Sequence, residues 1–327
     1  MIKEERMTGR DAVLKTIEFK YPGRIPTVKG ESADISMLYY LPASDFVAPE
    51  HGMDEWGCLW KSLNSDMGDQ GQVIRHPLAD WNTSSSYRFP DPNAPGRVEK
   101  FQTTVKHLVE EGKFICASIG KGPMHLLADL RGFEAFLLDM MEYPERIGFM
   151  LDGIFGFLLG LTERFSRLDV DAIWIWDDQA MQTGPLFSMN LWCRLFKPRY
   201  AELFRFAHAR GLKVFMHTCG HIGEHLGHLV EAGVDVIDNK QPSLWMDCPE
   251  VKQLKGKITF STCLDIQTTM NNISESEVEN ATHKLIRTLS LPSGGFLGTC
   301  YLNPDLKIRQ EKTLLMLEAF KTFRWNS

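Results

Sequence analysis

From about residue 101 onward, short apolar runs alternate with longer segments of helical periodicity. The short runs are rich in β-branched and aromatic side chains and end at glycine or polar residues, which is typical of buried strands. Strands that alternate with helices form βαβ units, and these units build a parallel sheet. We therefore predict the α/β class, with a (β/α)8 TIM barrel that spans residues 1–327 as one domain.

The predicted elements follow one another closely. Predicted strands cover 25–28, 114–119, 171–178, 214–219, 234–238, 257–262 and 295–299. Predicted helices cover 101–111, 133–142, 144–167, a segment from Asn190 through Pro198, 221–232, 248–254 and 275–289. Capping boxes at 8–11 and 274–277 mark helix starts, and Asn303 is the expected cap of a last helix.

Residues 32–100 interrupt this regular pattern. They are rich in Pro, Gly, Asp and Asn, and the aromatic residues Trp56, Trp60, Trp81 and Tyr87 are interspersed among them. A stretch this long without clear periodicity is more often a functional insertion than a plain loop. We expect an irregular, lid-like N-terminal segment that covers the barrel.

The segment Lys213–Gly220 carries the most specific chemical signal. An apolar run ends there in His217-Thr218-Cys219-Gly220. Residues i and i+2 of an extended strand point to the same side, so the imidazole and the thiol share one side at the end of the strand. Cys300 ends another apolar run that begins with glycine. One His and two Cys with an open fourth position form a known kind of catalytic zinc site.

Two interpretations of these residues stay open. The carboxyl ends of barrel strands gather catalytic groups, which favours a metal site. However, a buried cysteine is usually a small hydrophobic residue, and a histidine at a strand end is often only hydrogen-bonded. Cys263, near the same rim, is expected to be a packing residue. Water or a carboxylate such as Glu31 is a candidate for the fourth zinc ligand.

Further polar residues follow the other predicted strands. Asp177 and Asp178 end the strand that contains Trp176, and a buried carboxylate is costly unless it is paired or lies at the barrel mouth. Because neighbouring strand residues alternate in direction, we expect only one aspartate to face the pocket and choose Asp178 as the catalytic one. The candidate substrate-binding residues are Asp177, Trp176, Gln182, Gln241 and Asp265.

Composition narrows the possible partners. The net charge of -6 offers no basic surface for a phosphate backbone, so we expect no nucleic-acid partner. The apolar segment Ile147–Leu161 is too short for a membrane span and contains Asp152, so we expect no membrane partner either. Seven scattered cysteines and an N-terminus unlike a signal peptide indicate a cytoplasmic protein. The subunit count stays open, with a homo-oligomer among the options.

Together these motifs resemble the uroporphyrinogen decarboxylase-like superfamily, and within it the zinc-dependent, corrinoid-linked methyltransferases. The matching pieces are 9–11, 23–26, 54–57, Asp177-Asp178 with Gln182, 217–220, 233–236 and Cys300. They cover most of the chain, and the histidine with the two cysteines is the specific part. The resemblance implies that His217, Cys219 and Cys300 bind Zn²⁺ in a methyltransferase.

The resemblance also implies a reaction. Zinc would stabilise the oxygen of a methyl ether as its methyl group departs, and Asp178 would assist proton donation through a neighbour. The methyl group would pass to the reduced cobalt of a corrinoid (cobalamin) carried on a separate corrinoid protein. Tryptophans near the strand ends favour an aryl methyl ether as the small-molecule donor, although aromatic residues in a barrel more often belong to the core. The expected reaction is O-demethylation.

Three other functions stay open. One is methyl transfer from a methyl-corrinoid to a thiol such as coenzyme M, but enzymes of that kind typically have glycine where this chain has Tyr301. A second is uroporphyrinogen decarboxylation, which uses an arginine-rich segment soon after the first helix. Here no arginine occurs between Arg24 and Arg75, so this activity is disfavoured. The third is a non-catalytic partner of a corrinoid protein.

Overall fold

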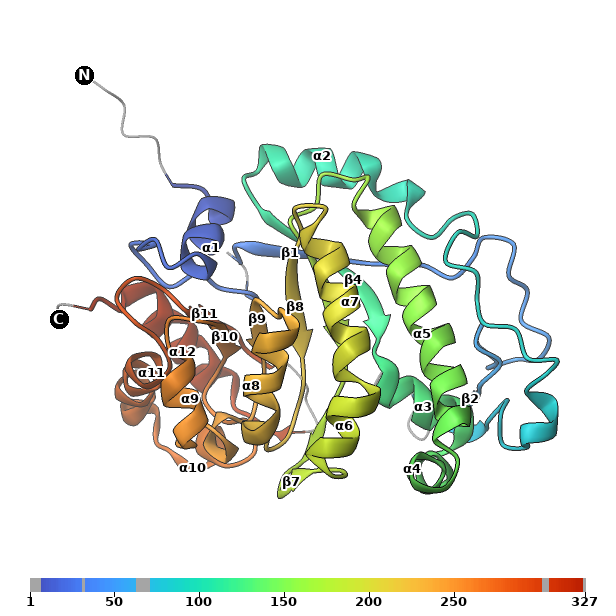
Figure 1. The fold of residues 1–327 in the computed structure, drawn as a ribbon. Coiled ribbons are helices and arrows are strands. Elements are labelled where there is room, and N and C mark those ends of the chain that lie inside the picture. The colour runs from blue at the N-terminus through green and yellow to red at the C-terminus, as the bar shows by residue number, and fades with distance from the viewer. Residues whose placement is uncertain (1–6, 31–32, 63–70, 302–305, 326–327) are drawn as a thin grey trace.

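The computed structural model describes residues 7–30, 33–62, 71–301 and 306–325 and shows a parallel seven-stranded sheet that curls into a barrel (Figure 1). In spatial order the strands are β1 (Ile35–Tyr39), β4 (Phe114–Lys121), β5 (Ala172–Trp176), β8 (Lys213–His217), β9 (Val236–Asp238), β10 (Thr259–Thr262) and β11 (Phe296–Gly298). All neighbouring pairs are parallel. The predicted TIM-barrel fold of the α/β class is confirmed.

A short segment at residues 26–28 closes the ring between β11 and β1. The Val28 amide donates to the Gly298 carbonyl at 2.8 Å, and the Gly298 amide donates to the Pro26 carbonyl at 2.9 Å. On the other side, the Asp34 amide donates to the Thr27 carbonyl at 2.9 Å. The predicted first strand at 25–28 is thus a single parallel bridge at Thr27, which takes the eighth position of the barrel.

Strand β1 lies within the predicted insertion 32–100, and here the structure differs from the expectation. Ile35 and Leu38 are buried, whereas the two residues between them are half-buried. This run therefore lacks the clean alternation by which a strand is recognised in a sequence. The irregular segment begins only after β1.

A buried ion pair joins two parts of the irregular segment, and its arginine also packs on a ring of α5. Arg97 donates to both carboxylate oxygens of Glu55 at 2.9 Å, and its guanidinium lies 5.0 Å from the centroid of the Phe157 ring. The segment contains the hairpin of β2 (Leu59–Lys61) and β3 (Gln72–Arg75), with the 3-10 helices η2 (Trp81–Thr83) and η3 (Glu99–Phe101). Figure 1 shows it as blue and cyan loops beside α5.

Helices cover the outside of the sheet (Figure 1). Their bounds are α1 (Gly9–Ile17), α2 (Gln102–Glu110), α3 (Pro123–Arg131), α4 (Phe133–Glu142), α5 (Pro144–Phe165), α6 (Met189–Leu195), α7 (Lys197–His208), α8 (Gly223–Ala232), α9 (Pro249–Leu254), α10 (Thr269–Asn272), α11 (Glu275–Leu289) and α12 (Gln310–Thr322). Both predicted capping boxes are present, with Thr8 and Ser274 as N-caps. Pro198 lies at the start of α7 and not inside one long helix, because proline disrupts a helix interior. The predicted cap Asn303 lies outside the described residues.

Large apolar side chains fill the barrel below its mouth. Phe215 lies between Phe114 and Trp174, with ring centroids 5.7 and 5.2 Å away. Val13 and Ile17 of α1 belong to the same cluster and lie at the amino-terminal ends of the strands. The carboxyl ends of the strands therefore form the open face, where barrel enzymes have their sites. Among the described residues, no helix has the length and apolar character that a membrane span needs.

Candidate metal centre

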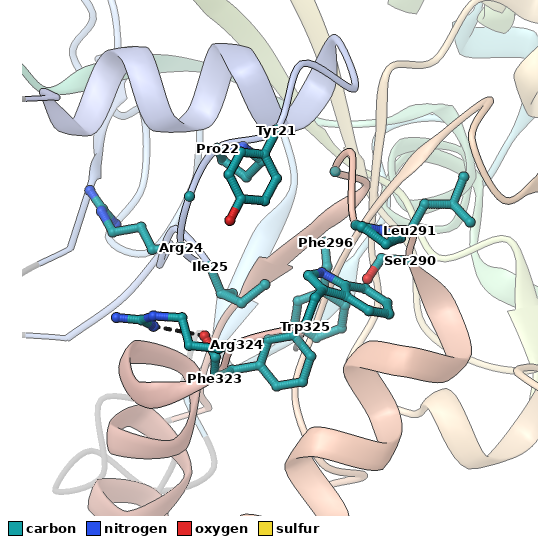
Figure 2. A pocket seen from close by; sticks show the side chains of 13 residues that line it. Tyr21, Pro22, Arg24, Ile25, Ser290, Leu291, Phe296, Phe323, Arg324 and Trp325 are labelled. Atoms are coloured by element: carbon teal, nitrogen blue, oxygen red, sulfur yellow. Dashed lines mark hydrogen bonds between the residues drawn. The ribbon is translucent and has the colours of Figure 1, made fainter. Parts of the chain in front are cut away.

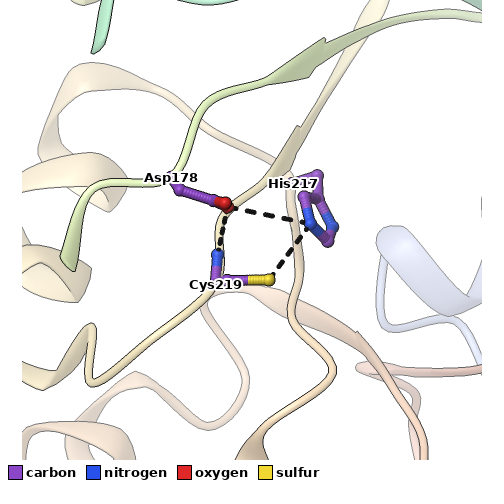
Figure 3. A group of neighbouring side chains, drawn as sticks. All are labelled: Asp178, His217 and Cys219. Atoms are coloured by element: carbon purple, nitrogen blue, oxygen red, sulfur yellow. Dashed lines mark hydrogen bonds and ion pairs between the residues drawn. The ribbon is translucent and has the colours of Figure 1, made fainter. Parts of the chain in front are cut away.

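The carboxyl end of β8 brings three potential metal ligands together (Figure 3). His217 Nε2 lies 3.4 Å from Cys219 Sγ and 3.8 Å from Asp178 Oδ1. Asp178 also accepts a hydrogen bond from the Cys219 amide at 2.7 Å, which holds the carboxylate against the turn after β8. The three ligand atoms lie within 4.8 Å of one another.

The turn that carries Cys219 depends on Gly220. Its φ is 84°, and a Cβ at this position would lie 2.3 Å from the Ala180 carbonyl oxygen, so only glycine fits without strain. The Gly220 amide donates to Gln241 Oε1 at 2.8 Å, and the Asn239 side chain donates to the Thr218 carbonyl at 2.6 Å. Side chains that follow β9 therefore fix the turn after β8.

Asp238 orients the His217 ring. Its Oδ2 atom accepts a hydrogen bond from His217 Nδ1 at 2.6 Å, which leaves the lone pair of Nε2 directed toward Cys219 and Asp178. Asp238 Oδ1 accepts from Lys240 Nζ at 2.5 Å and from Ser261 Oγ at 2.6 Å. Burial opposes the charge of Asp238, but the Lys240 ammonium and the bond from His217 hold the pKa of Asp238 well below its usual range. The ring thus has the outer partner that metal-binding histidines usually have.

The separations within this group fit a zinc ion. With bonds of about 2.05 Å to nitrogen, 2.3 Å to sulfur and 2.1 Å to oxygen, a tetrahedral site places N and S about 3.6 Å apart and N and O about 3.4 Å apart. The corresponding distances from His217 Nε2 are 3.4 Å to sulfur and 3.8 Å to oxygen. Imidazole, thiolate and carboxylate are also the ligands that zinc takes in proteins. The residues present therefore fit this metal.

The electrostatics of the group also favour a cation. Burial and the neighbouring Asp178 and Asp238 carboxylates raise the pKa of the Cys219 thiol. Burial opposes ionisation of Asp178 as well, but hydrogen bonding to His125 and the nearby His217 lower the pKa of Asp178 to about 2. An ionised Asp178 has no proton to donate at neutral pH. A divalent ion would offset its charge and deprotonate the thiol.

These residues face a cavity of about 960 Å³ at the barrel mouth, which we call the metal cavity. Asp178, His217, Cys219, Asp238 and Lys240 all line it. Aromatic side chains contribute much of the remaining wall, namely Tyr39, Trp60, Phe133, Trp174, Trp176 and Tyr301. A cavity of this size lies at the upper end for small-molecule sites.

Another hollow lies at the opposite end of the barrel (Figure 2). Residues 21–25, which precede the first barrel segment, form one wall, and residues 290–296 and 323–325 form the others. Its volume of about 20 Å³ suits a single water molecule. The metal cavity is therefore the better candidate for a substrate site.

A comparison with known families decides the group to which the chain belongs. The model described as Uroporphyrinogen decarboxylase (URO-D) matches residues 63–294, which is more than half of the chain. The chain belongs to the uroporphyrinogen decarboxylase family. A search of curated proteins finds no match.

Solved structures show what this URO-D family member resembles in fold. A methyltransferase from Methanosarcina mazei matches with a TM-score of 0.71 and 14% sequence identity, over 96% of this chain and 98% of that one. Xylanase 10B from Thermotoga maritima has a TM-score of 0.41 at 9% identity, over 74% of this chain and 85% of its own. D-psicose 3-epimerase from Clostridium cellulolyticum H10 has a TM-score of 0.40 at 11% identity, over 68% and 83%. The first likeness establishes a shared fold.

In this URO-D family member, Cys300 lies after β11 and outside the group of three ligand atoms. Its neighbours Thr299 and Tyr301 both line the metal cavity, whereas Cys300 is fully buried in the apolar core. Neighbouring residues of an extended chain point to opposite sides, which explains this arrangement. A local turn of the backbone at 299–301 would be needed to bring the sulfur into the cavity.

The two predicted aspartates occupy different environments. Asp178 and the neighbouring Trp176 line the metal cavity. Asp177 is fully buried behind them, where it accepts hydrogen bonds from the Met124 amide at 2.9 Å, from the Gln179 side chain at 2.6 Å and from the Tyr200 hydroxyl. Because burial dominates, the pKa of Asp177 is raised. The alternation at the end of β5 thus directs one carboxylate to the cavity and the other to the core.

The remaining predicted residues do not belong to the group of three ligand atoms. Gln182 is exposed on the hairpin of β6 (Ala180–Met181) and β7 (Gly184–Pro185) and donates to Gln267 at 2.7 Å. Asp265 is buried and accepts from two backbone amides at 2.9 Å. Gln241 is buried too, and its oxygen is used by Gly220. Substrate contacts of these three residues stay predictions.

Cys263 is buried in the core, and Glu31 lies outside the described residues.

Sequence reasoning missed α3 and with it His125. His125 Nδ1 lies 3.5 Å from Asp177 Oδ1, and His125 Nε2 lies 3.5 Å from Asp178 Oδ2. Burial opposes its charge, but the two carboxylates raise the pKa of His125 to about 10. The available signal was Pro123 after a glycine, because proline is favoured at the first position of a helix. His125 is thus a cationic donor on the wall of the metal cavity.

Proposed function

We propose that this protein is a zinc-dependent methyltransferase that takes methyl groups from aryl methyl ethers and passes them to a corrinoid. The convergence of His217 Nε2, Cys219 Sγ and Asp178 Oδ1 at the mouth of a URO-D family barrel carries this proposal. A mixed nitrogen, sulfur and oxygen donor set favours zinc over magnesium or calcium, which prefer oxygen ligands. The fold shared with a methyltransferase supports the reaction class.

In the proposal, His217, Cys219 and Cys300 hold the metal, and Asp178 takes the fourth position in the resting protein. One imidazole and two thiolates leave a nearly neutral centre with one exchangeable position. Asp178 would suit that position because the Cys219 amide donates to it at 2.7 Å and holds the carboxylate beside His217 and Cys219. Cys300 joins the centre by the local backbone turn described above.

Zinc, when bound, supplies a Lewis acid at the ether oxygen. Trp176 provides a wall for the aromatic ring, since its Nε1 donates to Ser118 Oγ at 3.0 Å and its ring centroid lies 5.1 Å from that of His217. His125 contacts Asp178 from the cavity wall and is the neighbour through which a proton reaches the phenolate product.

The acceptor in this proposal is the reduced cobalt of a corrinoid on a separate protein, which approaches through the open mouth of the metal cavity. The bond between the methyl carbon and the ether oxygen breaks as the carbon bonds to cobalt, and the oxygen leaves as a phenol after protonation. All seven cysteines carry free thiols, which supports a reducing, cytoplasmic compartment.

The charges of the metal cavity disfavour porphyrin decarboxylation. No arginine is among the described residues that line it. Lys29, Lys121 and Lys240 line it, and two of these lysines pair with aspartates, Lys121 with Asp129 at 2.7 Å and Lys240 with Asp238 at 2.5 Å. A substrate with several carboxylates would therefore find few free cations. This agrees with an uncharged ether as the substrate.

A direct assay tests the proposed reaction. Zinc-loaded protein is mixed with cob(I)alamin and a panel of methoxybenzenes, and methylcobalamin is followed by its absorbance while the phenol is quantified by chromatography. We expect equal amounts of both products, with none from the His217→Ala variant. The absence of a phenol from every ether in the panel would overturn the assignment of the donor.

The same protein separates the alternatives. Methylcobalamin is mixed with assorted thiols, and thioether is measured. Thioether without any phenol in the first assay would identify a methyl-corrinoid:thiol methyltransferase of the coenzyme M type. If the protein transfers methyl groups neither from ethers to cobalamin nor from methylcobalamin to thiols, but binds a corrinoid protein stably, it would be a non-catalytic partner.

A further inference from the structure

A second cavity, of about 570 Å³, adjoins the metal cavity and is called the side cavity here. Four residues line both cavities, namely Trp60, Gly120, Lys121 and Asp129. The side cavity lies between the barrel and the irregular segment, because Tyr40 and Trp56 come from that segment whereas Leu126 and Phe157 come from α3 and α5. The two cavities are therefore neighbouring compartments with a common wall.

Polar contacts fix the common wall. Trp60 Nε1 donates to Asp54 Oδ2 at 2.7 Å, and the Lys121 ammonium lies 4.2 Å from the centroid of the Trp60 ring. Lys121 also donates to Asp129 at 2.7 Å. A cation over an aromatic face and a salt bridge together hold both side chains in place. The Trp60 indole therefore has a fixed position where the two cavities meet.

The chemistry of the side cavity suits an uncharged apolar group. Its wall is mostly aromatic and aliphatic, with Tyr40, Phe46, Met53, Trp56, Leu126 and Phe157. The carboxylates in the wall already have partners. Glu55 is paired with Arg97, and Asp54 accepts from the Trp56 amide at 3.0 Å and from the Cys58 amide at 2.9 Å. A charged ligand group would thus meet no unpaired counterion among these residues.

Strand register gives the distance between the common wall and the metal ligands. Lys121 is paired with Trp176, and Trp176 is paired with His217. Two strand spacings separate Lys121 from His217, which is about 10 Å between their backbones. A methoxybenzene ring alone is shorter than this separation, whereas a second ring or an attached chain would extend a ligand along it.

We propose that the side cavity is a second subsite, which binds the distal ring or apolar chain of an extended aryl methyl ether. This inference rests on the proposed function, since it assumes that the methoxy oxygen lies at His217 and Cys219. The preferred substrates are then two-ring or long-chain aryl ethers, whose first ring packs on Trp176 and whose second group lies beyond Trp60.

Binding without turnover tests the subsite. Isothermal titration of the zinc-loaded protein, with no corrinoid present, compares methoxybenzene with 4-methoxybiphenyl. We expect the biphenyl ether to bind at least about tenfold more tightly, since a buried second ring adds apolar area and aromatic contacts.

Met53→Trp fills the side cavity from a half-buried loop position and should remove most of this advantage. Met141→Trp makes the same exchange at a side chain that is 74% exposed and should preserve it.

A second variant guards against misfolding of the first. Phe46→Ala removes a ring from the wall of the side cavity and should weaken biphenyl binding several-fold while methoxybenzene binding changes less than twofold. Equal binding of the two ethers by the native protein, or equal losses for both in each variant, would overturn the subsite. Selective binding of the biphenyl ether without any methyl transfer would support the second subsite and contradict the proposed methyltransferase activity. Methyl transfer with equal binding of both ethers would support the activity and contradict the subsite.

Discussion

The carboxyl ends of β8 and β11 differ in how their cysteines are presented. After β8, Cys219 and His217 point toward the metal cavity, 3.4 Å apart. After β11, Cys300 is buried between two residues that line the same cavity. The first end has a glycine turn and a carboxylate that fix the thiol. The second is tied to the site through Thr299, whose hydroxyl lies 3.2 Å from Lys240 Nζ.

This difference shows which metal ligands can be placed from neighbouring residues of the sequence and which depend on distant ones. His217 ends β8 and Cys219 follows it by two residues, and residues at i and i+2 of an extended segment face the same side. A third ligand from a distant strand depends on the backbone direction at one residue, and a change of one position turns its side chain from the cavity to the core. The following predictions test whether the two ends contribute equally to the metal centre.

Removal of His217 should have the largest effect on metal binding. His217→Ala deletes a first ligand, so we expect zinc affinity to fall by more than about 100-fold, which is the upper range for loss of an outer-shell partner. Zinc content after dialysis and competition with a chromophoric chelator measure this change. His107→Ala is the matched control, because His107 is an exposed residue of α2 paired with Glu111. Full zinc occupancy in the His217→Ala protein would contradict the proposed centre.

The pair Cys300→Ser and Asp178→Asn compares the two ends directly. We expect about one zinc per chain in the native protein. If Cys300 turns into the cavity to bind zinc, Cys300→Ser should lose most of this zinc, whereas Asp178→Asn should keep most of it. Elemental analysis of both purified variants gives the ratio. The opposite ranking would mean that Asp178, His217 and Cys219 hold the ion as they stand and that Cys300 is a core residue.

Asp238→Asn should have an intermediate effect. Asp238 accepts from His217 Nδ1 at 2.6 Å, and loss of such a partner typically lowers metal affinity by about 10- to 100-fold. Chelator competition measures this loss, with Asp235→Asn as the control, because Asp235 precedes the same strand and pairs with the half-exposed His208. If both variants lost equal affinity, the Asp238 contact would have no specific role in orienting the ring.

The difference between the ends of β8 and β11 also explains which features the sequence could predict. The barrel strands from β4 onward were predicted because their apolar runs are local, as was the shared side of His217 and Cys219. The mixed environment of β1, the turn from Gly122 into α3 and the pairing of Lys240 with Asp238 depend on residues distant in the chain. Patterns within one window carry no information about such contacts. The neighbourhood of Asp178 and His125 therefore emerged only from the structure.

Gln241→Ala should have the smallest effect and distinguishes a structural role from substrate binding. The Gln241 side chain accepts a hydrogen bond from the Gly220 amide at 2.8 Å, and an unsatisfied buried amide costs about 1–3 kcal/mol. We expect a lower melting temperature and a few-fold weaker zinc affinity, because the turn that carries Cys219 loosens. Gln253→Ala is the matched control, since Gln253 is an exposed glutamine on α9, away from the turn after β8. A raised KM for the ether at unchanged stability and zinc affinity would instead place Gln241 against the substrate, and the turn after β8 would then need no support from β9.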